Sequence, residues 1–323
     1  MRAFKIVVTD DLFGSYAEER EELSSIAGGL SVYKCETGRE VAEVVADADA
    51  VLVNQLEISK ELIQLMPRCR VISRYGVGVD NVDVEAATAA GMYVASVPDY
   101  GTQEVADHAF ALLLACIRGV SYKDHAIRQG RWNLIGSYPV HRTSGRVLGV
   151  VGFGRIGRAF VRRAGCWGFS RLLVHDPYVD PRDIEASGAE PVDLDTLLPA
   201  ADYVSLHVPL TEKTHHLINA QRLAGMSRAA IVINTSRGPV IDEAALEEAL
   251  RNDRLAAAGL DVYEQEPLPH SSGLRSLPNV VLTDHAAYYS VEALSELKRK
   301  AAVNVRLVLQ GEPPTYAVNR LHS

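Results

Sequence analysis

Ten short apolar runs, separated by stretches with helical spacing, constrain the fold of this 323-residue chain more than any other feature. Near-continuous hydrophobicity marks strands that are buried on both faces, and alternation with helices indicates parallel sheets. We therefore expect an α/β chain with two doubly wound parallel-sheet domains. The runs are residues 4–9, 48–53, 70–73 and 93–96 in a first series, and residues 146–152, 171–176, 202–208, 229–235, 256–262 and 279–284 in a second.

Two stretches with helical spacing connect and close these series. Residues 104–132 contain no proline and predict one long connecting helix. Residues 290–311 predict another helix, ended by Gly311, and we expect it to return the chain to the first domain. The predicted domains are residues 1–100 completed by 287–323, and residues 101–286.

Charge and composition favour a small-molecule partner. The net charge of −8 provides no basic cluster for nucleic acid or an anionic membrane. No run approaches the ~18 apolar residues that span a bilayer, and the N-terminus lacks the pattern of a secretory signal. We therefore expect a cytoplasmic protein whose four cysteines are reduced thiols. We expect neither a metal site nor a catalytic role at His108, His207, His215 and His216.

A glycine motif predicts a dinucleotide site. Gly152, Gly154 and Gly157 form G-x-G-x-x-G between an expected strand and an expected helix, which lets the backbone approach a pyrophosphate. Asp176 ends the next strand, near the ~20-residue offset of an acid that binds the adenosine ribose. Asp176 precedes Pro177, and Asp-Pro also opens turns, but the complete unit favours the cofactor role. A carboxylate repels a 2′-phosphate, so we expect NAD and not NADP.

Seven ordered segments closely resemble the D-isomer-specific 2-hydroxyacid dehydrogenase family. The resemblance implies NAD-dependent interconversion of a D-2-hydroxy acid and its 2-keto acid. It further implies a cleft between a flavodoxin-like substrate domain and a Rossmann NAD-binding domain joined by long helices, and a homodimer formed through the NAD-binding domain. Within the family, the branch of C-terminal-binding proteins is most similar at Arg74 and at Tyr288-Tyr289, although that branch typically has Trp where Tyr288 stands. The segments are residues 74–83, 97–114, 150–160, 207–218, 234–246, 259–267 and 283–290.

The resemblance assigns the catalytic roles to His285, Glu266 and Arg237. His285 and Arg237 follow predicted parallel strands, and ligands bind at that edge of open α/β sheets. A histidine titrates near neutral pH and can move the proton, a carboxylate such as Glu266 can orient it, and a guanidinium can grip a substrate carboxylate. A lone histidine is more often structural, but the combination favours acid/base chemistry.

The resemblance also implies further contacts to cofactor and substrate. Residues 74–80 contain two glycines whose backbone N–H groups can form an anion nest for the substrate carboxylate, the alternative being an ordinary glycine turn. Tyr100 and Tyr288 either shape the substrate pocket or pack between domains. The remaining cofactor contacts are expected at Thr102, Arg155, Ile156, Val208, Pro209, Thr214, Thr235, Ser236 and Asp261, and the substrate loop at Arg74, Tyr75, Gly76, Val77 and Gly78.

Two other functions fit the same fold. One is an NAD(H)-sensing interaction protein that resembles the corepressors, and the other is a dehydrogenase for a phosphorylated or inorganic acid. The chain has no disordered tail of the kind that a scaffold protein would use, which favours the enzyme. The sequence does not identify the natural acid or the physiological direction.

Overall fold

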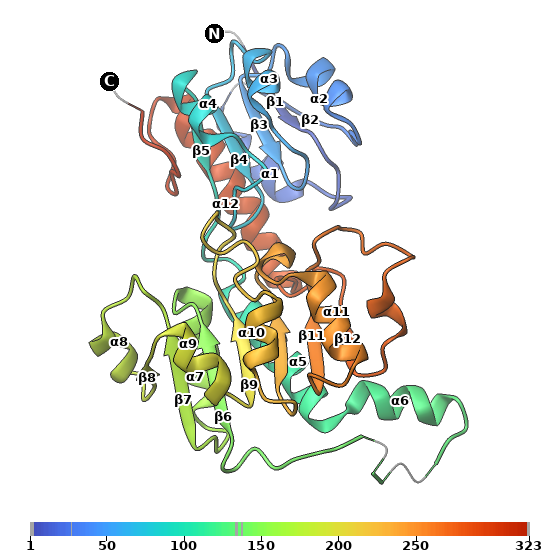
Figure 1. Ribbon diagram of the computed structural model, residues 1–323. Coiled ribbons are helices and arrows are strands. Elements are labelled where there is room, and N and C mark those ends of the chain that lie inside the picture. Colours follow the sequence, from blue (N-terminus) through green and yellow to red (C-terminus); the bar gives the residue numbers. More distant parts are fainter. Residues whose placement is uncertain (1–2, 27, 133–134, 137, 322–323) are drawn as a thin grey trace. The chain divides into compact units, whose positions relative to one another are not determined.

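The computed structural model describes residues 3–26, 28–132, 135–136 and 138–321, and the chain divides into two compact units (Figure 1). Unit 1 comprises Met1–Gly101 and Ser290–Ser323, and unit 2 comprises Thr102–Tyr289. Each unit contains one sheet whose paired strands are all parallel, which confirms the predicted fold class.

The sheet of unit 1 has five strands in the order β2-β1-β3-β4-β5. Val41 of α2, Ile63 of α3 and Ala87 of α4 join a buried core on one face, and α12 packs with α1 on the other. The strands are β1 Phe4–Val8, β2 Gly28–Val32, β3 Ala50–Val53, β4 Val71–Arg74 and β5 Tyr93–Ala95, and the helices are α1 Ala17–Leu23, α2 Gly38–Val45, α3 Lys60–Gln64, α4 Val84–Ala89 and α12 Val291–Gln310.

The sheet of unit 2 has seven strands in the order β12-β11-β10-β9-β6-β7-β8. The strands are β6 Val147–Val151, β7 Arg171–His175, β8 Glu190–Pro191, β9 Tyr203–Leu206, β10 Ile231–Asn234, β11 Ala257–Leu260 and β12 Val280–Leu282. The helices are α5 Thr102–Arg118, α6 Val120–Arg128, α7 Arg155–Ala164, α8 Pro181–Glu185, α9 Leu194–Ala200, α10 Ala220–Gly225 and α11 Glu243–Arg251, with short 3₁₀ turns η1 Gly238–Val240 and η2 Gly273–Ser276.

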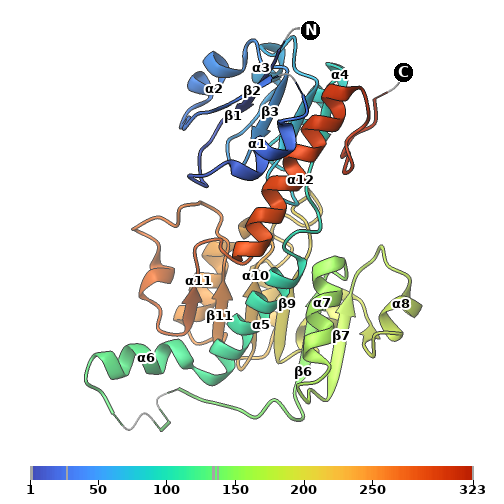
Figure 2. The same cartoon turned by 180° about the vertical axis from the view of Figure 1, so that it is seen from behind.

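Two separate hydrophobic cores lie on the two faces of this sheet. One contains Leu197 of α9, Leu223 of α10 and Leu246 of α11, and the other contains Leu113 of α5 and Phe160 of α7. Figure 2 shows α5 and α7 together on the face opposite to α10 and α11. Because apolar residues pack on both faces, the interior strands need continuous apolar runs.

The two strands that the apolar runs do not predict, β2 and β8, are edge strands. β2 begins with two glycines and is partly exposed along its length, and β8 has two residues, one of them Pro191. An edge strand packs fewer apolar side chains, so its sequence carries a weaker signal.

The single helix predicted across residues 104–132 is wrong. Gly119 interrupts it with a left-handed φ of +59°, and α5 and α6 are bent by 63° at that point. A left-handed residue cannot continue an α-helix, and glycine adopts this conformation at little cost. Within the described ranges, no single helix is long and apolar enough to cross a membrane. Taken together, the bent pair α5 and α6 has the required length and composition.

A buried ion-pair network joins α12 to α1. Lys298 is 4% exposed, and its Nζ lies 2.6 Å from Oε2 of Glu18 and 3.8 Å from Oε2 of the fully buried Glu19. Burial raises the pKa of Glu19, whose Oε1 accepts a hydrogen bond from the hydroxyl of Tyr75 at 3.0 Å. Removing one partner of such a network leaves uncompensated charge in the interior.

We expect Lys298→Met to lower the free energy of unfolding by about 3 kcal/mol, because it leaves two carboxylates without their cation. Urea unfolding of the full chain measures this loss. Arg299→Met is the matched control, since Arg299 is 43% exposed where it pairs with Glu21 and Glu22. That variant should lose less than about 1 kcal/mol. Equal losses in the two variants would contradict the importance of the buried network.

Candidate active site

The turn between β6 and α7 has the geometry that a dinucleotide requires. Gly152 has a φ of +95°, and a Cβ there would lie 2.6 Å from the carbonyl oxygen of His207. A Cβ at Gly157 would lie 2.1 Å from the carbonyl oxygen of Gly152. At Gly154, the Cβ position has no non-neighbouring atom within 4 Å in the described part of the chain. The backbone at Gly154 is therefore open to a pyrophosphate at the N-terminus of α7.

Asp176 follows β7 and ties this turn to that strand. Its Oδ2 accepts a hydrogen bond from the backbone N–H of Phe153 at 2.7 Å, and its Oδ1 accepts one from the N–H of Tyr178 at 2.9 Å. The second bond forms the turn that an Asp-Pro pair favours. A carboxylate has about four acceptor sites, so the half-buried Asp176 can still receive ribose hydroxyls beside the glycine motif.

The other expected cofactor residues lie at helix starts or after strands of the same sheet. Arg155 and Ile156 begin α7, and Thr102 begins α5. Val208 and Pro209 follow β9. The hydroxyl of Thr214 donates to the carbonyl of Pro209 at 2.6 Å and closes that loop.

Thr235 supplies an independent sign that a polar ligand completes this site. Its Oγ1 is buried directly after β10 and has no hydrogen-bond partner among the described residues. A buried hydroxyl without a partner is costly and calls for an explanation. Together with the open backbone at Gly154, this orphaned hydroxyl fits NAD.

The imidazole of His285, in the loop after β12, is held by Glu266. Its Nδ1 lies 2.6 Å from Oε2 of Glu266, and the two side chains are 31% and 32% exposed. Because a carboxylate only accepts hydrogen bonds, Nδ1 carries the proton and Nε2 is left for a substrate. Burial raises the pKa of Glu266, but the hydrogen bond and charge of His285, the N–H of Tyr263 and the charge of Arg237 outweigh it and lower the net value. Glu266 is therefore ionised near neutral pH.

Asp261, directly after β11, holds the loop that carries His285. Its carboxylate is fully buried and accepts hydrogen bonds from the hydroxyl of Thr283 at 2.6 Å and from the N–H groups of Ala286 and Ala287, both at 3.0 Å. The backbone N–H of His285 donates to the carbonyl of Asp261 at 2.8 Å. These bonds fix the positions of residues 283–287, and the cofactor contact expected at Asp261 stays a prediction.

Arg237 lies in a short loop after β10 that is shaped by Asn234, a residue that the sequence analysis did not select. The amide of Asn234 accepts from the N–H and hydroxyl of Ser236 at 3.0 and 2.7 Å, and donates to the carbonyl of Arg237 at 2.9 Å. Asn234 is 1% exposed. An Asn at the end of a buried strand that continues as Thr-Ser-Arg-Gly is a turn signal that can be recognised in the sequence.

In unit 1, Arg74 is the last residue of β4, and residues 75–78 follow that strand. The N–H of Tyr75 donates to the carbonyl of Val53 at 2.8 Å, and its hydroxyl bonds Glu19, so Tyr75 is engaged inside the unit. Among the described residues, the N–H groups of Gly76, Val77 and Gly78 donate no backbone hydrogen bond, so they can serve as donors for the expected nest. Arg74 donates through Nε to the carbonyl of Asn54 at 3.1 Å.

A buried aspartate that the sequence analysis did not select shapes the neighbouring loop of unit 1. Asp10 is 6% exposed, and its carboxylate accepts from the N–H groups of Asn54, Gln55 and Leu56 at 2.9, 2.6 and 3.2 Å.

Two aromatic side chains expected near the substrate lie in different units. Tyr100 of unit 1 is 8% exposed. Tyr288 of unit 2 packs edge-on against His285, with ring centroids 6.4 Å apart. No group of three or more His, Cys, Asp or Glu side chains that could hold a metal ion is present among the described residues.

Comparison with known proteins extends these observations. Residues 110–287 match the family described as D-isomer specific 2-hydroxyacid dehydrogenase, NAD binding domain. The chain is 44% identical over 287 residues to glyoxylate reductase of Korarchaeum cryptofilum, and the aligned region covers 87% of this chain and 85% of that protein. It is 37% identical over 319 residues to D-3-phosphoglycerate dehydrogenase of Methanocaldococcus jannaschii, which covers 98% of this chain and 59% of that protein.

A solved structure agrees with these matches. The crystal structure of D-lactate dehydrogenase from Aquifex aeolicus complexed with NAD and lactic acid has a TM-score of 0.87 and 26% sequence identity, and covers 97% of this chain and 98% of that chain. None of these three similar proteins is named as a C-terminal-binding protein, so they give no support to that branch.

His207, under the glycine turn, should make the protein less stable in acid. Its ring packs against Phe160 with centroids 4.9 Å apart, and burial lowers its pKa to about 3. An unfolded histidine binds a proton near pH ~6.5, so between about pH 6.5 and 3 the unfolded state binds more protons and stability falls as the pH falls.

The measurement is urea unfolding at pH 7.5 and pH 5 of the wild type and of His207→Gln. In the wild type, Nε2 of His207 lies 2.9 Å from the hydroxyl of Ser205, and the glutamine amide can keep this hydrogen bond. At pH 5, protonation of His207 in the unfolded state lowers the free energy of unfolding of the wild type by about 2 kcal/mol. The variant has no histidine at this position and should not show this loss. Identical pH dependence of the two proteins would refute this assignment.

Proposed function

Because the chain belongs to the D-isomer specific 2-hydroxyacid dehydrogenase family, we propose that it interconverts a small D-2-hydroxy acid and its 2-keto acid through His285, Glu266 and Arg237. It is an NAD-dependent oxidoreductase, and the three side chains are the proposed catalytic residues. The observation that carries the proposal is the 2.6 Å contact between His285 Nδ1 and Glu266 Oε2 at the carboxyl edge of the sheet.

His285 acts as the acid in reduction and as the base in oxidation. NAD, when bound at the glycine motif, supplies or accepts the hydride at C2 of the acid. The imidazolium donates its Nε2 proton to the keto oxygen, and the neutral imidazole takes the proton back in the reverse direction. Glu266 stabilises the charged ring and fixes its orientation, so that Nε2 is the nitrogen that reacts.

Arg237 binds the substrate carboxylate and polarises the keto group. Its guanidinium is planar and can donate two parallel hydrogen bonds to a carboxylate. The positive charge also favours the negative charge that develops on the keto oxygen. A lysine at this position would keep the charge and lose the paired geometry.

Residues 74–78 of unit 1 are proposed to bind the substrate carboxylate through backbone N–H groups. Two observations within that unit support this role. Asp10 and the engaged Tyr75 fix the loops after β3 and β4, and Arg74 bonds the backbone of the first of these loops. Tyr288, packed against His285, is proposed to limit the size of the substrate side chain.

The proposed substrates are small 2-keto acids such as glyoxylate and hydroxypyruvate, because the similar archaeal protein is named glyoxylate reductase. A phosphorylated acid is the second candidate, because the match to D-3-phosphoglycerate dehydrogenase extends over 98% of this chain. An inorganic acid and an NAD(H)-sensing corepressor have no comparable support.

A homodimer formed through the NAD-binding unit is also proposed. Large apolar side chains on α6 and just after it are exposed to solvent, and burial against a second copy would remove them from water. They are Val120 at 55%, Ile127 at 45%, Trp132 at 83% and Ile135 at 93% exposure.

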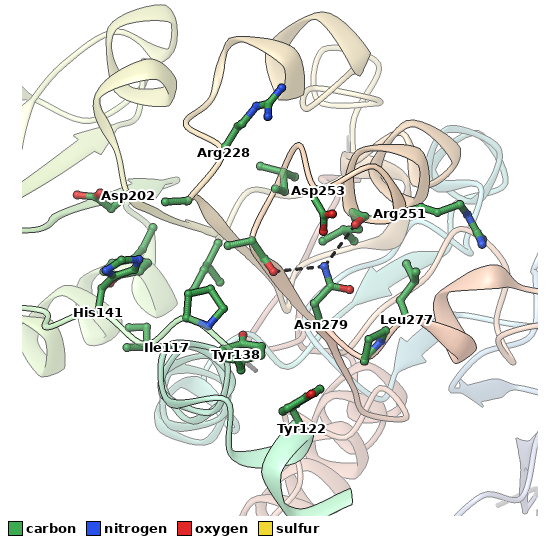
Figure 3. Close-up of a pocket in the computed structure, with 18 of the residues that line it drawn as sticks. Ile117, Tyr122, Tyr138, His141, Asp202, Arg228, Arg251, Asp253, Leu277 and Asn279 are labelled. Carbon is green, nitrogen blue, oxygen red and sulfur yellow. Dashed lines mark hydrogen bonds between the residues drawn. The ribbon is translucent and has the colours of Figure 1, made fainter. Parts of the chain in front are cut away.

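A cavity of about 660 Å³ lies next to this segment, with Tyr122 and Tyr138 on one side and Leu277 and Asn279 on another (Figure 3). It lies at the amino ends of β9 to β12, away from the proposed catalytic edge, and could receive apolar side chains of a second copy. The cytoplasmic location and the absence of nucleic-acid or membrane partners stay predictions from the sequence.

NADH consumption with a panel of 2-keto acids tests the catalytic proposal. We expect His285→Ala to lower kcat/KM by about 1,000-fold, and Arg237→Lys to lower it by about 100-fold with a higher KM. His270→Ala is the matched control, because His270 is an exposed histidine of the same unit. The panel should include glyoxylate, hydroxypyruvate, pyruvate and phosphohydroxypyruvate.

Full activity of His285→Ala would exclude His285 as the acid/base. A preference for phosphohydroxypyruvate would favour the second candidate substrate class.

Size-exclusion chromatography with light scattering tests the dimer. We expect the wild type to elute as a dimer and the double variant Trp132→Ser/Ile135→Ser to shift towards the monomer, because the exposed apolar contacts are lost. Trp167→Ser is the control, since Trp167 is 45% exposed but lies after α7 and outside the proposed interface. A wild-type monomer at micromolar concentration would refute the proposal.

A further inference from the structure

We propose that His216 is a positioning residue that fastens the loop of Arg237 to the loop of Glu266. The proposal rests on the catalytic roles proposed above and adds a residue outside the proposed catalytic set. His216 lies after β9, in a polar turn whose histidines the sequence marks as non-catalytic. The structure places it between two loops that must keep a fixed relation to each other.

The backbone of His216 holds the first of these loops. Its N–H donates to the carbonyl of Pro239 at 2.7 Å, and the N–H of Ile218 donates to the carbonyl of Val240 at 3.0 Å. Pro239 and Val240 belong to η1, which begins immediately after Arg237. A displacement of residue 216 therefore displaces η1, the segment that follows Arg237 and helps to fix the position of its guanidinium.

The side chain of His216 holds the second loop. Its Nε2 lies 2.7 Å from Oε1 of Glu264, two residues before Glu266. Glu264 is fixed in turn by reciprocal bonds with Glu243, in which each backbone N–H donates to the other carboxylate, at 3.1 and 3.0 Å. The imidazole thus bonds to a carboxylate that already has a defined position.

The two loops also touch each other directly. A Cβ at Gly238 would lie 1.9 Å from the carbonyl carbon of Tyr263 and 2.4 Å from the backbone nitrogen of Glu264. Backbone therefore lies against backbone, and the N–H of Tyr263 donates to Oε1 of Glu266 at 3.1 Å. A small displacement at residues 263–264 changes the positions of both the guanidinium and the carboxylate.

His216 has a left-handed φ of +48°, which residues other than glycine adopt rarely. Such a conformation persists only where surrounding contacts hold it, and it often marks a functional position. The pair with Glu264 is about one-third exposed, at 36% and 37%, so it adds little to global stability. The structure therefore assigns it to alignment of the site.

Three substitutions separate the side chain from the backbone conformation. His216→Ala removes the contact to Glu264. His216→Asn also removes it, but tolerates a positive φ. His216→Gln can restore a hydrogen bond to Glu264 through its amide. We expect the Ala and Asn variants to show a kcat/KM about tenfold lower, with both a higher KM for the keto acid and a lower kcat, and Gln to recover most of the loss.

Glu264→Ala should reproduce this loss, and the double variant with His216→Asn should be no worse than either single variant, since both remove one contact. NADH affinity, measured by fluorescence titration, and the thermal midpoint should stay near wild type. Recovery by Asn but not by Gln would assign the effect to backbone strain and overturn the proposal.

Arg237→Lys and Glu266→Gln, measured in the same series, distinguish a failure of the positioning role from a failure of the proposed catalytic roles. If these variants lose activity while the His216 variants do not, the positioning role is overturned and the proposed function stands. If neither Arg237 nor Glu266 matters, the proposed function fails, and the positioning role fails with it.

Discussion

The buried carboxylate of Asp261 determines how the proposed catalytic histidine is presented. The carboxylate accepts three hydrogen bonds from residues 283–287, and the backbone carbonyl of Asp261 accepts a fourth from the N–H of His285. His285 has a φ of +57°, which such contacts can maintain. The loop cannot relax without leaving a buried acceptor unpaired, so the imidazole reaches Glu266 from a fixed position.

Apolar patterning predicts the interior of both sheets because those strands are buried on both faces. It does not predict β2 and β8, whose positions at sheet edges need fewer apolar contacts. The single helix predicted through Gly119 is a different kind of error. Helical periodicity continues through that glycine, and only the left-handed conformation there separates α5 from α6. A glycine inside a helical pattern permits either outcome.

Motifs select candidate catalytic side chains, but they do not identify the residues that hold those side chains in place. The sequence selects His285 and Glu266, and the structure brings them together. It does not select Asn234, whose partners Ser236 and Arg237 lie in the same turn, or His216, which contacts Glu264 and Pro239. The partners of His216 lie on segments whose proximity depends on the order of strands β9, β10 and β11, and that order cannot be read from local spacing. A turn signal at Asn234 was available, but nothing near His216 in the chain indicates Glu264.

At three places on the carboxyl edges of the two sheets, an aspartate after one strand accepts hydrogen bonds from the loop after a neighbouring strand. Asp10 follows β1 and bonds the loop after β3, Asp176 follows β7 and bonds the turn after β6, and Asp261 follows β11 and bonds the loop after β12. In each case the two strands are neighbours. Parallel strands end side by side and leave loop N–H groups unpaired, and a carboxylate can accept several of them. These aspartates therefore act largely in shaping loops, and one of those loops presents the imidazole that is proposed to transfer the proton.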